Sequence, residues 1–78
     1  MRAPKQLWPA NLRALRKRCE LRVEDVAWIC GVTPRAVNKW MRGENRIPQW
    51  ASLLLQAYEA GLLTARWIAD RVDAPPPR

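Results

Sequence analysis

Apolar residues recur at helical spacing along the chain, in segments that proline and glycine separate. The first stripe of apolar positions consists of Trp8, Leu12, Leu15 and Cys19. Intervals of four, three and four residues place its members on one side of a helix, and basic side chains occupy the other sides. The pattern therefore predicts a half-buried helix over Pro9–Cys19.

Two shorter helices should follow, with three residues between them. The second is predicted over Val23–Cys30, and Gly31 should end it because glycine readily adopts the left-handed conformation that closes a helix. Thr33 followed by Pro34 indicates a new start, since a threonine hydroxyl caps backbone N–H groups and proline suits the first helical position. The third helix should run to about Arg42.

Two further helices are predicted after a short loop. The fourth should extend from Pro48 to about Ala60, with Gly61 as its stop. Its predicted apolar stripe is Trp50, Leu53, Leu54, Ala57 and Tyr58, with Leu55 on a further face. Thr64 should cap a fifth helix that continues through Val72.

These elements predict an all-α fold, a compact bundle of about five short helices that contains a helix-turn-helix. Residues 1–7 are expected to be a flexible basic arm, residues 8–72 the folded domain, and residues 73–78 a proline-rich disordered tail. No β-hairpin signal or internal repeat interrupts this organisation.

Charge then indicates the class of partner. The 78 residues carry 14 Lys and Arg against seven Asp and Glu, a net charge of +7. Residues 1–46 hold eleven of the basic and four of the acidic residues, so the whole excess lies there and the remainder is neutral. A segregated basic excess in so short a chain favours a polyanion, either nucleic acid or an anionic membrane surface.

Composition also excludes several classes of function. The chain has no histidine, the commonest general base, and its two cysteines are too few for a four-ligand zinc site. We therefore predict no enzyme activity, no cofactor or metal, and no small-molecule ligand. The chain has neither a signal peptide nor an apolar run of spanning length, so we expect a cytoplasmic protein without a membrane partner. Cys19 and Cys30 should then be reduced rather than bridged.

The third helix has one polar and one apolar side. At about 100° per residue, a polar stripe roughly 100° wide contains Arg35, Asn38, Lys39 and Arg42. The opposite side is formed by Ala36, Val37, Trp40 and Met41. The free side thus offers hydrogen-bond donors and one amide, which suit base edges and phosphates in a DNA major groove.

A set of residues in and around this helix forms a recognisable motif. The set is Leu12-Arg13-Ala14-Leu15-Arg16, Val26-Ala27, Gly31-Val32, Val37, Trp40-Met41-Arg42-Gly43 and Pro48. It resembles the phage Cro and repressor type of helix-turn-helix, also called the XRE family, over about residues 12–60. The chain departs from the family at Val23, where a glutamine is frequent, and at Met41, where an acid is frequent.

The resemblance implies a role in DNA binding for specific residues. Bases would be read by Arg35, Asn38 and Lys39, and bases or backbone would be approached by Thr33, Pro34 and Arg42. Phosphates would be contacted by Arg22, Asn45 and Arg46. Among the basic residues of the first helix we expect Arg16 to contact phosphate as well, while others pair with acidic neighbours or are solvated.

Several of these residues have a purely structural explanation. Helix initiation alone accounts for Thr33 and Pro34. The tryptophans at helical spacing suit a core or an interface better than base stacking, which needs single strands.

The last predicted helix and the residues before it carry more apolar surface than a domain this small is expected to cover by itself. We predict a symmetric homodimer through the C-terminal region, formed by Leu62, Leu63, Trp67, Ile68 and Val72. The alternative is that these residues complete the core of a single chain. A dimer would bind an inverted-repeat operator, since two half-sites add affinity and specificity.

The sequence thus favours a sequence-specific, double-stranded-DNA-binding transcriptional regulator, a repressor or autoregulator of a phage or mobile-element operon. Two alternatives stay open. The first is an antitoxin-like or other protein-interaction module that also binds DNA. The second is an RNA-binding protein, because charge alone does not distinguish the two nucleic acids. A MerR-like regulator fits less well, because in that class the motif begins the domain.

Overall fold

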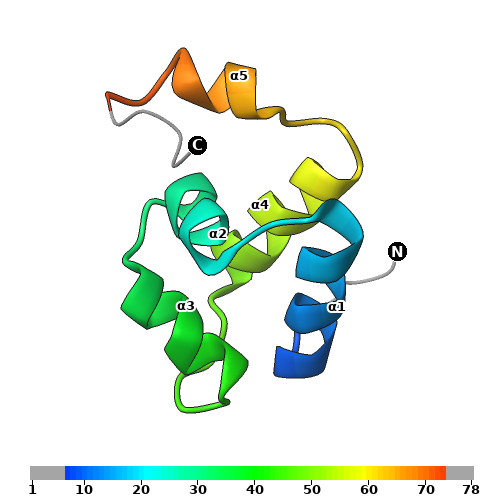
Figure 1. The fold of residues 1–78 in the computed structure, drawn as a ribbon, viewed down its shortest axis with the longest axis vertical. Helices are drawn as coiled ribbons and strands as arrows, with labels where there is room; N and C mark the ends of the chain where they lie inside the picture. Colours follow the sequence, from blue (N-terminus) through cyan, green and yellow to red (C-terminus); the bar gives the residue numbers. More distant parts are fainter. Residues whose placement is uncertain (1–6, 74–78) are drawn as a thin grey trace.

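The computed structural model describes residues 7–73, which form five α-helices and, within that range, no strand (Figure 1). The helices are α1 (Pro9–Cys19), α2 (Val23–Cys30), α3 (Pro34–Met41), α4 (Gln49–Glu59) and α5 (Ala65–Ala69). The predicted all-α bundle of five short helices is confirmed. The predicted arm and tail fall, except for residues 7 and 73, outside the described residues.

α5 is shorter than the predicted helix, which was to continue through Val72. Its start is as predicted, since the Thr64 hydroxyl accepts a hydrogen bond from a backbone N–H of the first turn at 3.0 Å. Its last helical residue is Ala69. The N–H of Arg71 donates to the carbonyl of Ile68, only three residues back, at 2.9 Å, so a tight turn closes the helix.

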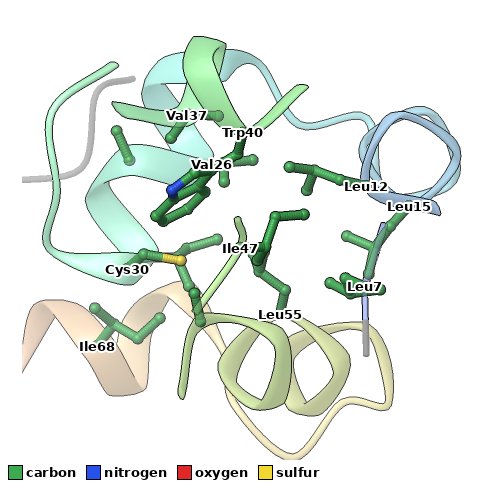
Figure 2. Packing of buried hydrophobic residues seen from close by; sticks show 13 residues of the cluster. Leu7, Leu12, Leu15, Val26, Cys30, Val37, Trp40, Ile47, Leu55 and Ile68 are labelled. Atoms are coloured by element: carbon green, nitrogen blue, oxygen red, sulfur yellow. The ribbon is translucent and has the colours of Figure 1, made fainter. Parts of the chain in front are cut away.

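The hydrophobic core lies between the first four helices (Figure 2). Its largest fully buried apolar side chains are Leu12, Leu15, Val26, Val37, Ile47 and Leu55. Trp40 enters the cluster from α3. Ile68 is the one buried side chain of α5, so this helix is joined to the core chiefly through a single residue.

The buried face of α4 differs from the predicted stripe. Its buried residues are Ala51, Ser52 and Leu55, whereas Trp50 and Leu53 are exposed. Apolar side chains surround most of this helix, so spacing alone does not select a face. Packing against α2 selects it, and the predicted stripe was therefore wrong for Trp50 and Leu53.

The folded domain begins one residue earlier than predicted. Leu7, placed in the flexible arm by the sequence pattern, is buried in the core, and its N–H donates to Oγ of Ser52 at 3.3 Å. Trp8, a member of the first apolar stripe, is exposed at the N-cap of α1. The contact between Leu7 and α4 therefore anchors the residue just before the N-cap of α1.

Both cysteines are free thiols. Cys30 is buried in the core, and this burial raises the pKa of its thiol to about 12. Burial is also the largest cause that raises the pKa of the partly exposed Cys19 thiol. Both side chains thus stay protonated at neutral pH and behave as small apolar groups.

Replacing Leu55 with alanine should lower the free energy of unfolding by about 2–5 kcal/mol, because it leaves a cavity in the core. Leu53→Ala is the matched control in the same helix, since Leu53 is 44% exposed and Leu55 is 0% exposed. We expect the control to lose less than about 1 kcal/mol. Urea unfolding measures both values, and equal losses would contradict the buried face assigned to α4.

Candidate nucleic-acid interface

A three-residue turn closes α2 and opens α3. Gly31 has a φ of +69°, a left-handed conformation that strains other residues, and the N–H of Val32 donates to the carbonyl of Ala27 at 2.9 Å. Oγ1 of Thr33 then accepts a hydrogen bond from the N–H of Ala36 at 3.2 Å. The predicted stop and start signals are confirmed, and together they fix the angle at which α3 leaves α2.

α3 has a buried and a free side. Val37 is 0% exposed and Trp40 is 4% exposed, so these two side chains fix the helix to the core. On the other side, Arg35 and Arg42 are exposed, and Asn38 and Lys39 are partly exposed. Thr33 and Pro34 are exposed at the N-terminal end. The four residues of the predicted polar stripe therefore share the free side of α3.

The loop after α3 folds back on the last turn of that helix. Gly43 has a φ of +75°, and the N–H of Glu44 donates to the carbonyl of Lys39 at 2.9 Å. The Glu44 carboxylate forms an ion pair with Arg42. Both side chains are at least half exposed, so the pair contributes only about 0–1 kcal/mol to stability.

Two arginines of α1 reach the end of α3. Nη1 of Arg13 donates to the carbonyl of Met41 at 2.6 Å. Arg16 is partly buried; its Nε donates to the carbonyl of Leu21 at 3.3 Å and its Nη1 to Sδ of Met41 at 3.2 Å. Arg16, expected to contact phosphate, is thus engaged by the protein itself.

The sequence alone indicates no particular role for Arg13. The available signal was its spacing of three residues from Arg16, which places both guanidinium groups on one face of α1. The spacing does not show which element this face contacts. In the structure that element is α3.

Arg22 lies exposed at the start of α2. Its N–H donates to Oδ2 of Asp25 at 2.8 Å, and its Nε lies 3.6 Å from a carboxylate oxygen of Glu24. Its side chain also lines a shallow, mainly cationic hollow of about 270 Å³ with Arg13, Arg16, Lys17, Glu20 and Leu21. The predicted phosphate contact at Arg22 thus lies beside three other cations, but its guanidinium group is also close to the carboxylates of Glu24 and Asp25.

The remaining predicted phosphate contacts are in the loop between α3 and α4. Asn45 and Arg46 are exposed there. They line a hollow of about 340 Å³, whose other walls are Leu7, Trp8, Pro9, Gly43 and Ile47. This places both residues beside the N-terminal end of α1.

A family model described as a helix-turn-helix domain matches residues 10–67, from within α1 into α5. The chain belongs to this helix-turn-helix domain family. No curated protein and no solved structure matches it. Membership implies a DNA-binding regulator that acts on double-stranded DNA, with α2, the turn at 31–33 and α3 as the binding motif.

In the helix-turn-helix domain, four of the five residues predicted for self-association are accessible. Leu62, Trp67 and Val72 are exposed and Leu63 is partly exposed. Ile68 is only 6% exposed because it packs in the core of the single chain. The surface available for pairing therefore does not include Ile68.

The described residues meet neither the requirements of a metal site nor those of a membrane-spanning helix. Between residues 7 and 73, no three His, Cys, Asp or Glu side chains gather where they could hold a metal ion. In the same range, no helix has the length and apolar character needed to cross a membrane.

Proposed function

We propose that this domain is a sequence-specific transcriptional regulator that reads DNA with α3 in the major groove. The two-sided character of α3 carries the proposal. Burial of Val37 and Trp40 holds the helix rigidly, while its free side presents cations and an amide to solvent. Rigid presentation of such donors is what recognition of base edges requires.

Within this proposal the polar residues divide by what they contact. Arg35 suits a bidentate contact to guanine, Asn38 a bidentate contact to adenine, and Lys39 a guanine acceptor. Thr33, Pro34 and Arg42 lie close to bases or backbone. Sequence-independent affinity comes from phosphate contacts by Arg22, Asn45 and Arg46, with Arg16 contributing through the field of its charge.

We infer that the regulator is a repressor or autoregulator of a phage or mobile-element operon. Its resemblance to the phage Cro and repressor type supports this role. A domain that occupies the major groove of a promoter competes directly with the polymerase for the same DNA. In an antitoxin-like function the domain would bind a protein partner in addition to DNA. In the RNA-binding alternative its partner would be RNA instead of duplex DNA.

We also propose that the domain binds its operator as a homodimer. Leu62, Trp67 and Val72 are 76%, 45% and 42% exposed. A second copy of the domain would cover this exposed apolar surface. Residues 47–78 carry no net charge, so two copies meet there without repulsion. One module contacts a limited length of DNA, and pairing doubles it.

Selection of binding sites from a random duplex pool at near-physiological salt should yield an inverted repeat. The repeat follows from two copies of α3 related by a two-fold axis. Single-stranded RNA and random duplex serve as controls for charge-driven binding. A pool that shows no enrichment would contradict sequence-specific DNA binding and favour the RNA-binding or protein-interaction function.

Arg35→Ala should cost about 1–3 kcal/mol on the selected operator and relax the preference at one base position. Arg46→Ala is the comparison, since it removes an equal charge from the loop. It should weaken all duplexes alike and flatten the salt dependence. Fluorescence anisotropy with operator and random duplex measures both variants. If both lose affinity equally for the two duplexes, Arg35 does not read a base.

Leu62→Asp should convert the dimer to a monomer, because it buries a charge in an apolar interface. Leu53→Asp is the control, a leucine exposed on α4 outside the proposed surface. Sedimentation equilibrium at tens of micromolar measures the association, and circular dichroism checks that both variants fold. A monomeric wild-type protein at that concentration would contradict the proposed dimer.

A further inference from the structure

The carbonyl groups in the last turn of α3 all have hydrogen-bond donors, but the donors come from two places. The carbonyls of Asn38, Lys39 and Trp40 accept the N–H groups of Arg42, Glu44 and Gly43, at 3.0, 2.9 and 3.2 Å. These donors follow α3 directly in the chain. The Met41 carbonyl instead accepts Nη1 of Arg13, which lies 28 residues away in α1, at 2.6 Å. The end of α3 is thus completed by another helix.

α1, which carries Arg13, is itself held in place by the core. Leu12 and Leu15 fix α1 in the core, at 0% and 1% exposure. Arg16, one turn after Arg13, holds Sδ of Met41 and the carbonyl of Leu21. A cation at the C-terminal end of α3 is also favoured by the dipole of that helix. Two side chains from one rigid element therefore converge on the final residue of α3.

The position of the C-terminal end of α3 affects contacts to DNA bases more than contacts to phosphates. A helix of eight residues is about 12 Å long, so a tilt of about 10° around its capped N-terminus moves its C-terminal end by about 2 Å. Such a shift breaks hydrogen bonds to base edges, which tolerate a few tenths of an ångström. Long cationic side chains follow a phosphate over the same distance at little cost.

We propose that Arg13 is a positioning residue for base recognition, which fixes the tilt of α3 through the Met41 carbonyl. This inference rests on the proposed function of α3. Arg13 then affects the choice between operator and random duplex, beyond the general attraction that its charge gives to any DNA.

Lys17 offers a matched control for this role. It is an exposed cation of the same helix and lines the same hollow as Arg13. Within residues 7–73 its side chain makes no hydrogen bond or ion pair. Lys17→Ala and Arg13→Ala therefore remove one positive charge each from neighbouring places, but only the second removes a contact with α3.

The test compares the affinities of both variants for the selected operator and for random duplex. Lys17→Ala should weaken the two duplexes by the same factor. On random duplex, Arg13→Ala should lose as much affinity as Lys17→Ala. On the operator it should lose about ten-fold more affinity than Lys17→Ala, roughly the loss of one good base contact. If the ratio of the two affinities is the same in both variants, Arg13 is not a positioning residue, whatever its effect on stability.

Amide hydrogen exchange gives a readout that does not depend on DNA. The amides of Gly43 and Glu44, which donate to carbonyls of α3, should exchange faster in Arg13→Ala and unchanged in Lys17→Ala. Unchanged exchange in Arg13→Ala would overturn the mechanical part of the proposal. A wild-type protein that binds all duplexes alike would contradict the proposed function instead, and the exchange measurement would still decide whether Arg13 holds α3.

Discussion

Burial of Val37 and Trp40 is the interaction on which the rest of the candidate nucleic-acid interface depends. A helix of eight residues does not form stably in water by itself, so α3 exists because these two side chains are taken into the core. Trp40 also meets Trp50 of α4 edge to face, with ring centroids 6.4 Å apart. The direction of the polar stripe is therefore set by core packing on the opposite side of the same two turns.

The cations of the domain differ in what they contact, and net charge alone conceals this difference. Arg13 and Arg16 are engaged with Met41, and Arg18 forms two hydrogen bonds with the carboxylate of Glu59, which lower the pKa of that carboxyl group. In contrast, Arg35, Lys39 and Arg46 form no ion pair within residues 7–73. Three of the cations without an ion pair in the described range thus lie on α3 and the loop after it.

Features decided by neighbouring residues were predictable from the sequence. The stop at Gly31 and the caps at Thr33 and Thr64 involve atoms within five residues of each other, so local chemistry determines them. The face of α4 and the direction of Arg13 were not predictable. They depend on partners in other helices, and in the case of Arg13 the partner is 28 residues away. Sequence periodicity identifies an amphipathic helix without identifying its neighbour.

The arrangement of the helices constrains how two copies would share one operator. α5 and α3 lie at opposite ends of the molecule, which is 32 Å long (Figure 1). If two copies paired end to end through α5, their α3 helices would point in opposite directions, away from any common duplex. Half-sites one helical turn apart need both α3 helices on the same side, about 34 Å apart. Two copies would therefore have to meet side by side, with the proposed surface of Leu62, Trp67 and Val72 along the flank that they share.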